Sequence, residues 1–476
     1  MTDAAKIQTA ALPSAAAVLA DIWRLAGLSP EVLPRATLTG AEPVLPSSFP
    51  VNTAAQASIA AAALAASEVW RERTGQVQTI SVDMRDAAAE CTGWFSVDGR
   101  VPDVWDKISG LYPCGAETAE PGWVRIHANF AHHRDGALKL LGLPAGEATE
   151  KADVVRALRR WRANDFAEAA AQANLVVSAL RSFAQWDAHP QNAAIAAMPL
   201  FSLERIGDAP PRPLPKLDAD RKPLAGLRVL DLTRILAGPT CGRTLATYGA
   251  DVMLVNSPHL PNVEAIIDTS RGKLSAHVDL ATEDGRQTLM RLARDAHVFV
   301  QGYRPGGLAR RGFSPEALAQ LNPGIVCVSL SAYGGVGPWA ERRGFDSLVQ
   351  TATGFNHAEG AAFDGEPKAL PMQILDYASG FLMAFGAQAA LLRQAKEGGS
   401  WLVRVSLAQT AHWLRGLGRI DGTQAPRPDF KALLETYDSG YGKLVTFPHA
   451  AKFSRTRTDG MRPSMPPGSH APAWPV

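Results

Sequence analysis

Cysteine is scarce in this chain of 476 residues. The four cysteines, Cys91, Cys114, Cys241 and Cys327, lie far apart and form no CxxC pair. A disulfide framework and a cysteine-ligated zinc site are therefore not expected, and the pattern is typical of a reducing compartment. We expect a cytoplasmic protein.

A strong charge of one sign is also missing. The formal net charge is +2 at pH 7, and 20% of the residues are charged. Proteins that bind nucleic acid usually carry a basic stripe or patch, so no nucleic-acid partner is expected. The Ala-rich N-terminus contains Asp3 and predicts a short amphipathic helix instead of a signal peptide. No run of ~18 or more apolar residues is present, so we expect no membrane-spanning segment.

Two kinds of binding motif are lacking as well. No GxGxxG follows the first expected strand of the middle region, which argues against an ordinary dinucleotide site. His127, His132 and His133 lie close together, but no carboxylate motif joins them. We interpret them as packed or surface histidines, and no metal site is expected.

Between residues 226 and 424, short apolar segments alternate with helical patterns. Strands are expected at 227–232, 251–255, 297–301, 325–331 and 401–407. Helices are expected at 238–250, 283–296 and 314–322. This alternation predicts an α/β fold with a Rossmann-like parallel sheet and helices on both faces. Ligands of such sheets bind beyond the carboxyl ends of the strands.

Composition divides the chain into parts. Residues 207–225 are rich in proline and charge and predict a stiff linker, and a second break lies near residue 425. We therefore expect an N-terminal part (1–206), a linker (207–225), a Rossmann-like domain (226–424) and a tail (425–476).

The chain contains an apparent internal repeat. Residues 62–90 resemble residues 385–413 at a constant offset of 323, and both predict an Ala-rich helix, a turn, a strand and a second helix. The alternative is a chance likeness between Ala-rich helices. In this register Asp376 falls on Thr53, so the first copy has no carboxylate at that position.

Asp376 interrupts the start of a long apolar run, "PMQILDYASGFLMAFGAQAALLRQ". An ionised carboxylate is costly to bury without a partner. One interpretation is a helix N-cap, which is a common role of aspartate. The other is a nucleophile at a helix N-terminus, where the helix dipole favours negative charge.

Residues 227–411 resemble the class III (CaiB/BaiF-type) CoA-transferases, a family that includes formyl-CoA and carnitine CoA-transferases and 2-methylacyl-CoA racemases. The likeness rests on the segments "LAGP", "RGK", "RPG", "LNP" and "SAYGGVGP". The N-terminal part is similar to the later half of the same family, including its small α+β domain. The chain thus looks like two partial family copies joined. Family members form interlocked dimers, which implies a homodimer or heteromer.

The resemblance implies that the nucleophile is Asp376, in "ILDYASG". It implies an acyl-CoA:carboxylate CoA-transferase that works through an aspartyl anhydride and an aspartyl-CoA thioester. Its substrates would be an acyl-CoA and a small carboxylic acid, with no permanently bound cofactor and no metal. The acyl group and the acceptor acid are not given by the sequence.

The residues that resemble the family's CoA contacts are Leu236, Ala237, Gly302, Tyr303 and Arg310. Several of these contacts depart from the family pattern. The second strand ends in "LVNSPHLPN" without the usual basic residue, and Gly302-Tyr303 replaces an Asn-Phe pair, although Tyr303 can still stack on adenine. These departures favour an alternative function, a non-catalytic CoA-binding partner subunit or pseudoenzyme.

A racemase is disfavoured because Phe345 stands where racemases have the histidine that precedes Asp346. A phenyl ring cannot move a proton. We interpret Asp346 as structural or as a helix cap. His357, in the segment before Asp376, is a candidate to face the acyl group.

Overall fold

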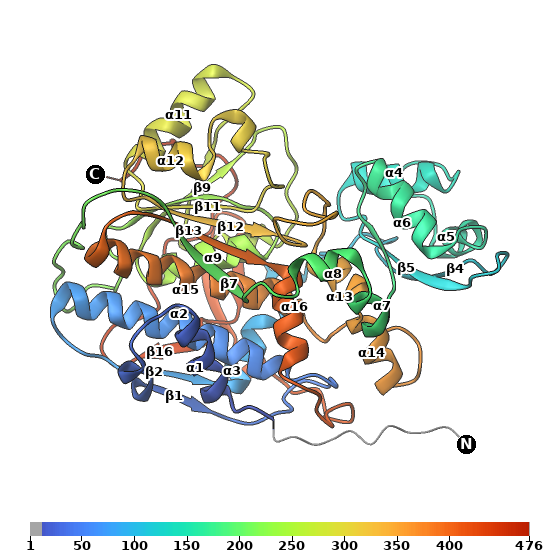
Figure 1. Cartoon of the computed structure of the whole chain (residues 1–476), viewed down its shortest axis with the longest axis horizontal. Coiled ribbons are helices and arrows are strands. Elements are labelled where there is room, and N and C mark those ends of the chain that lie inside the picture. The colour runs from blue at the N-terminus through green and yellow to red at the C-terminus, as the bar shows by residue number, and fades with distance from the viewer. Residues whose placement is uncertain (1–11, 476) are drawn as a thin grey trace.

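The computed structural model describes residues 12–475 and shows a large body with a smaller lobe at one side (Figure 1). The expected N-terminal helix is present as α1 (Ala15–Leu25), and the side chain of Ser14 caps it by accepting from the Ala17 amide at 3.2 Å. Residues 1–11 of that expected segment, including Asp3, lie outside the described residues.

The body is built on a sheet of seven strands. Their order across the sheet is β10 (Leu274–His277), β9 (Asp251–Asn256), β8 (Arg228–Leu232), β11 (Val298–Gln301), β12 (Val326–Ser331), β13 (Ser400–Ser406) and β7 (Phe201–Gly207). All neighbours are parallel except β13 and β7, which are antiparallel. The prediction of an α/β fold with a parallel sheet is confirmed except at β7, which was not expected and pairs antiparallel with β13, and the five expected strands are all present.

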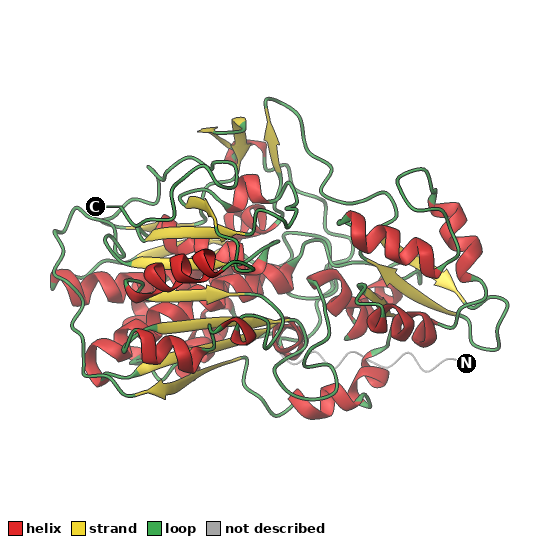
Figure 2. Ribbon diagram, turned by 90° about the horizontal axis from the view of Figure 1, so that it is seen from above, coloured by secondary structure: helices red, strands yellow, loops and turns green. Residues whose placement is uncertain are grey.

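Helices cover both faces of this sheet (Figure 2). Along the strands, alternate residues point to opposite faces, so Val229 and Val298 join one core while Leu230 and Phe299 join the other. The first core is covered by α9 (Ala237–Thr247) and α15 (Ile374–Glu397), the second by α11 (Glu283–Arg294) and α12 (Pro315–Leu321).

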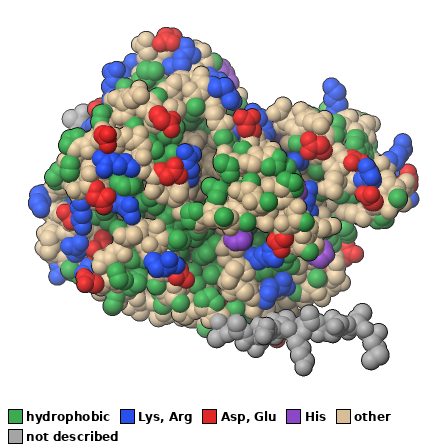
Figure 3. Space-filling model, in the orientation of Figure 1, with side chains coloured by type: hydrophobic (Ala, Val, Ile, Leu, Met, Phe, Trp, Pro, Cys, Tyr) green, Lys and Arg blue, Asp and Glu red, His purple; other side chains and the backbone are tan. Residues whose placement is uncertain are grey.

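Helix α15 is the central helix of the body. By length and composition it could cross a membrane, but its entire apolar window is buried inside the protein. That burial is the behaviour of a core helix. Figure 3 shows positive and negative side chains interspersed over the visible face, without a continuous basic stripe there.

The internal repeat is present in the structure at the expected offset. Helix α2 (Val51–Thr74) has the same length as α15, and its bounds shifted by 323 (51 + 323 and 74 + 323) are those of α15. Each helix is followed by a strand and a further helix: β2 (Ile80–Asp83) and α3 (Met84–Cys91) in the first copy, β13 and α16 (Leu407–Gly416) in the second.

The pairing of strands repeats too. Strand β2 lies between a parallel neighbour, β1 (Ala36–Thr39), and an antiparallel one, β16 (Ala451–Phe453). Strand β13 likewise lies between parallel β12 and antiparallel β7. The two long helices touch, since the Gln388 side-chain amide of α15 donates to the Ala62 carbonyl of α2 at 3.0 Å. A chance likeness would not reproduce this order of pairing.

The smaller lobe contains an antiparallel sheet, β4 (Gly110–Cys114), β5 (Gly122–Ile126) and β6 (Val177–Ala179). Helices α4 (Ala131–Leu140), α5 (Lys151–Leu158) and α6 (Ala163–Gln172) cover it, and together they bury a hydrophobic core of their own. The lobe projects from the body (Figures 1 and 2) and meets α13 (Asp346–Ala352), where the Arg181 amide donates to the Thr351 carbonyl at 3.2 Å.

The segment 208–225 contains no helix or strand, and it lies against α2. Arg73, near the end of that helix, donates to the carbonyls of Pro215, Pro223 and Ala225. In the tail, β14 (Glu435–Ser439) and β15 (Gly442–Thr446) form a sheet with β3 (Phe95–Val97). The remaining elements are η1 (Pro30–Arg35), α7 (Phe183–Asp187), α8 (Pro190–Ile195), α10 (Ile266–Thr269), η2 (Ala309–Arg311), α14 (Phe355–Ala362) and η3 (Lys431–Leu433).

Candidate active site

Asp376 lies in the first turn of α15 and does not cap the helix. The helix begins at Ile374, its N-cap position is Gln373, and no side chain at that position caps it. The N-cap interpretation of Asp376 is therefore wrong. Its side chain is buried at 7% exposure, and its carboxylate accepts no hydrogen bond from any of residues 12–475. A buried carboxylate without a donor is costly, which calls for a role other than stability.

The cap of α15 is supplied from elsewhere in the chain, by Asp346. Its Oδ2 accepts from the backbone amide of Asp376 at 2.9 Å, and the Gln350 side-chain amide donates to its Oδ1. The interpretation of Asp346 as structural is thus made specific. Its carboxylate satisfies an otherwise unpaired amide in the first turn of α15, the helix that carries Asp376.

The first copy has the same device without the second carboxylate. Glu42 Oε1 accepts from the Thr53 amide at 2.6 Å, and Thr53 is the residue that the offset of 323 places on Asp376. Both copies therefore cap the same backbone position with an acidic side chain. Only the second copy adds a carboxylate at that position.

The two carboxyl groups, Asp346 and Asp376, perturb each other. Burial raises the pKa of Asp376 well above its usual range, and the neighbouring charge of Asp346 raises it further. Burial also raises the pKa of Asp346, to about 7, although the hydrogen bonds from Asp376 and Gln350 and the charge of Arg125 oppose the rise. Two carboxyl groups this close do not both ionise easily, so their titration is shared.

Helix α9 approaches this turn of α15 closely. A Cβ added at Gly380 would lie 2.4 Å from the Ala237 carbonyl oxygen, so only glycine allows this crossing. The crossing places two expected CoA contacts, Leu236 and Ala237, at the start of α9 beside the turn that follows Asp376. The preceding residue, Ile235, has φ of 78°, an uncommon conformation for a β-branched side chain. Such outliers cluster at functional sites.

The small lobe contributes Arg125, which sequence reasoning missed, and His127, which it interpreted only as a packed or surface histidine. The ring of His127, just after β5, stacks on Phe345 at 4.1 Å between centroids. Arg125 precedes it on β5 and lies close enough to Asp346 for their charges to interact. The alternation of "VRIHA" marks Arg125 and His127 as sharing one face of a strand, but it does not say what that face meets.

The three histidines of the sequence analysis behave as packed or surface groups. Burial lowers the pKa of His127 and of His133 to about 3, and His132 is exposed. Among residues 12–475, no group of three or more histidine, cysteine, aspartate or glutamate side chains could hold a metal ion. His357 is exposed on α14, whereas Asp376 is buried.

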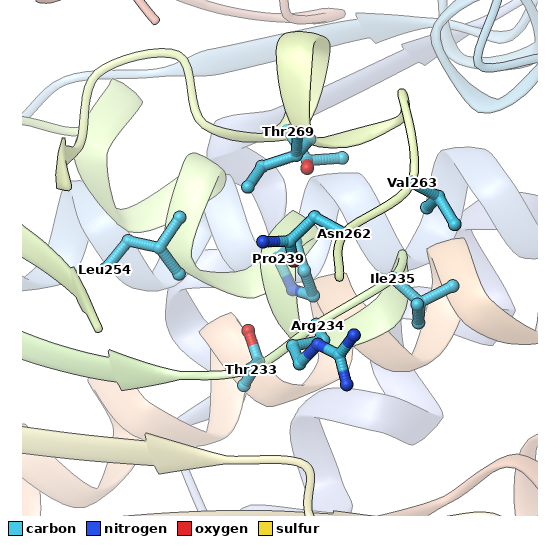
Figure 4. A pocket seen from close by; sticks show the side chains of 9 residues that line it. Thr233, Arg234, Ile235, Pro239, Leu254, Asn262, Val263 and Thr269 are labelled. Carbon is cyan, nitrogen blue, oxygen red and sulfur yellow. The ribbon is translucent and has the colours of Figure 1, made fainter. Parts of the chain in front are cut away.

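Two hollows open at the carboxyl ends of the strands. The first is lined by Arg234, Ile235, Pro239 and Asn262, among others (Figure 4). The second is lined by residues that include Gln301, Arg304, Gly306, Leu308 and Ser329. Neither is lined by Asp376. Both lie where ligands of parallel sheets bind.

The remaining expected CoA contacts lie beside the second hollow. Gly302 and Tyr303 directly follow β11, and the Tyr303 amide donates to Gln301 Oε1 at 3.0 Å. Burial raises the pKa of Tyr303. Arg310 is exposed, and its backbone amide donates to the Gly306 carbonyl at 3.0 Å.

Arg234 and Arg304 lie close enough to Arg343 for their charges to affect it. Burial and the charges of Arg304 and Arg234 lower the pKa of Arg343. The Nε atoms of Arg234 and Arg343 are buried without an acceptor among residues 12–475. Like charges repel, so the group favours an anionic ligand. Sequence reasoning missed Arg234 and Arg343, although their position in loops after strands was a usable signal.

Fold and site together define a class of protein. The protein is an α/β protein with a mostly parallel seven-stranded sheet, and a buried carboxylate lies in the first turn of its central helix. Residues 224–417 match the model of CoA-transferase family III, the family that the sequence of this region resembles.

The chain is similar over part of its length to several known proteins. A probable fatty acyl-CoA transferase of Mycobacterium tuberculosis is 35% identical over 204 residues, which cover 40% of this chain and 52% of the relative. The succinate–glutarate CoA-transferase of Agrobacterium fabrum is 34% identical over 197 residues, 37% of this chain and 49% of the relative. A solved CaiB/BaiF family protein from Brucella suis is 29% identical with a TM-score of 0.38, covering 47% of this chain and 65% of that one. The chain thus spans about half the length of these two curated relatives.

Proposed function

We propose that this protein is an acyl-CoA:carboxylate CoA-transferase with Asp376 as its nucleophile. The observation that carries the proposal is the state of this side chain: it is buried, it accepts no hydrogen bond from residues 12–475, and it lies in the first turn of a core helix. A cap or an ion pair would explain a buried aspartate, and neither is present. A desolvated carboxylate is a better nucleophile than a hydrated one.

The reaction proceeds by two exchanges at Asp376. A carboxylate oxygen attacks the thioester carbonyl, the C–S bond breaks, and a mixed anhydride and CoA thiolate result. The thiolate attacks the aspartyl carbonyl of the anhydride, releases the first carboxylate and leaves an aspartyl-CoA thioester. The acceptor carboxylate repeats the two steps in reverse order and departs as the new acyl-CoA. Atoms and charge balance without a metal or a redox cofactor.

Asp346 has a positioning role in this scheme. It holds the backbone of Asp376 through the 2.9 Å hydrogen bond, and its negative charge discourages ionisation of the nucleophile. A carboxylate with a raised pKa is more basic and so more nucleophilic once it is ionised.

We infer that CoA lies across the carboxyl ends of the strands. There it would contact Leu236, Ala237, Gly302, Tyr303 and Arg310. The loop before α9 and the residues after β11 border the two hollows. The three arginines Arg234, Arg304 and Arg343 add positive charge that suits the phosphates of CoA, and they offset the basic residues that are missing after β9.

We infer further that residues 1–206 and 226–424 are two partial family copies, joined by 207–225. The repeated helix, strand pairing and acidic cap support this division. Residues 425–476 form a tail that pairs with the first copy, and the first copy supplies the small lobe. The partners are an acyl-CoA and a small carboxylic acid, and a homodimer or heteromer remains the family-based expectation. The buried free cysteines fit a cytoplasmic location.

The proposal is tested by trapping the intermediate. The protein is incubated with acetyl-CoA, treated with borohydride or hydroxylamine, digested and analysed by mass spectrometry. A modified Asp376, absent in Asp376→Asn, is expected. If no acyl-CoA modifies Asp376 while CoA itself binds, the alternative of a CoA-binding pseudoenzyme or partner subunit, which the weakened CoA contacts favour, replaces the transferase.

A further inference from the structure

Arg125 is a buried cation without a partner. Arg125 is 8% exposed, and its Nε is buried without an acceptor. Its guanidinium makes no hydrogen bond or ion pair with residues 12–475. Such a group is costly, and natural proteins pair it or use it. Burial lowers the pKa of Arg125 only to about 10, so the group is charged at neutral pH.

The small lobe directs Arg125 at the active site. On β5, Val124 and Ile126 point into the core of the lobe, so Arg125 points to the opposite face. On that same side His127 stacks on Phe345, the residue before Asp346. Asp346 in turn holds the amide of Asp376 at 2.9 Å. Arg125 therefore lies on the side of the small lobe that faces Asp346, close enough for the two charges to interact.

Asp346 does not satisfy this guanidinium. Its two oxygens are taken by the Asp376 amide and the Gln350 side chain, and no ion pair joins it to Arg125. Instead, the guanidinium lies over the Trp105 ring at 5.5 Å from its centroid. A cation–π contact fixes the plane of an arginine and leaves its N–H donors free at the edge. The Nδ1 atom of His127, also buried without a partner, adds a further polar atom beside it.

We propose that Arg125 binds a second, non-reacting carboxylate of the substrate, so that the preferred substrates are dicarboxylic acids and their mono-CoA thioesters. The inference rests on the proposed transferase function, because Asp376 must hold the reacting end. A guanidinium fork matches a carboxylate through two parallel N–H donors. An acyl chain without its own anion would leave the buried cation uncompensated, and a site built for a polar group rejects the analogue that lacks it.

The test compares two acyl-CoA donors of the same chain length, glutaryl-CoA and pentanoyl-CoA, below saturation. The rate of borohydride-trapped adduct formation at Asp376 is measured by mass spectrometry. The wild-type protein should react with glutaryl-CoA at least about tenfold faster than with pentanoyl-CoA, as expected for a charge-assisted hydrogen bond. Arg125→Met should lose most of this preference, and Arg125→Lys should keep part of it because a charge remains.

The control is Arg160→Met, which removes an exposed arginine of the same lobe and should keep the full preference. Equal rates with the two donors in the wild-type protein overturn the inference even if Arg125→Met does not fold. A preference that survives in well-folded Arg125→Met, or an equal loss with both donors, also overturns it. Absence of any adduct with either donor refutes the proposed function itself, and the two failures are thereby distinguished.

Discussion

Replacing Asp346 by asparagine should shift the pH dependence of the reaction while preserving the helix cap. Asparagine keeps an oxygen that can accept from the Asp376 amide, so the hydrogen bond of 2.9 Å can persist. The negative charge next to the nucleophile is removed. Because that charge raises the pKa of Asp376, its removal should lower this pKa, and burial alone should keep it above the usual range.

The size of the shift follows from Coulomb's law. The Asp346 carboxylate accepts from the backbone amide of the residue that carries the other carboxylate. Two charges ~6 Å apart at an effective dielectric of ~20 interact by about 3 kcal/mol, which corresponds to about 2 pKa units. The nucleophile must be ionised, so activity rises with pH through the pKa of Asp376. The acidic limb of kcat/KM should therefore move to lower pH by about 2 units in Asp346→Asn.

The assay is the pH profile of CoA transfer from an acyl-CoA to a carboxylic acid. Glu42→Gln is the matched control, because it removes the charge of the side chain that caps the equivalent amide of the first copy, where no carboxylate follows. Its profile should equal that of the wild-type protein. A limb that stays in place or moves to higher pH in Asp346→Asn refutes the electrostatic coupling. Complete loss of activity in a folded variant would instead give Asp346 a direct chemical role.

Other predictions follow from the same structure. Asp376→Asn should abolish CoA transfer without lowering the melting temperature, since this side chain caps nothing; retained transfer would refute the assignment. The isolated fragment 226–476 should be insoluble or less stable than the full chain, because it lacks α2 and β7; a soluble, equally stable fragment would contradict this. Although burial opposes it, His449 lowers the pKa of Glu90 from 4.5 to about 2. About 3 kcal/mol of folding stability should therefore be lost as the pH falls from 4.5 to 2. Acid-unfolding measurements should show that Glu90→Gln lacks this pH dependence. No deuterium should enter carbon 2 of a 2-methylacyl-CoA in heavy water; uptake that disappears in His127→Phe would revive the racemase.

Local pattern was enough for the elements of the middle region. Each expected strand of 226–424 is a short apolar run, and burial on both faces of a parallel sheet requires such runs. Strands β7 and β10 were missed because "FSLERIG" and "LSAH" are partly polar and lie at the two edges of the sheet, where one side has no neighbour. These two segments are strands because each pairs with a neighbouring strand, and this pairing is not visible in the local sequence.

The repeat was also predictable, because equal spacing of helix, turn and strand is written in the order of residues. Its register correctly set Thr53 opposite Asp376. That both positions have their amides capped by an acidic side chain was not predictable. The caps come from Glu42 and Asp346, which stand at unequal distances along the chain from the amides they hold.

By itself the sequence determined that Asp376 begins a long apolar helix and that its surroundings match a family with a nucleophile there. Whether this aspartate caps the helix, pairs with a cation or stands free depends on atoms brought together by folding. The structure decided that question through Asp346, 30 residues away in sequence. It also brought Arg125 from the small lobe to the same site. The burial of a side chain and the charges around it depend on residues that are distant in the sequence and close in space. The order of residues alone does not determine these contacts; they are set when the chain folds.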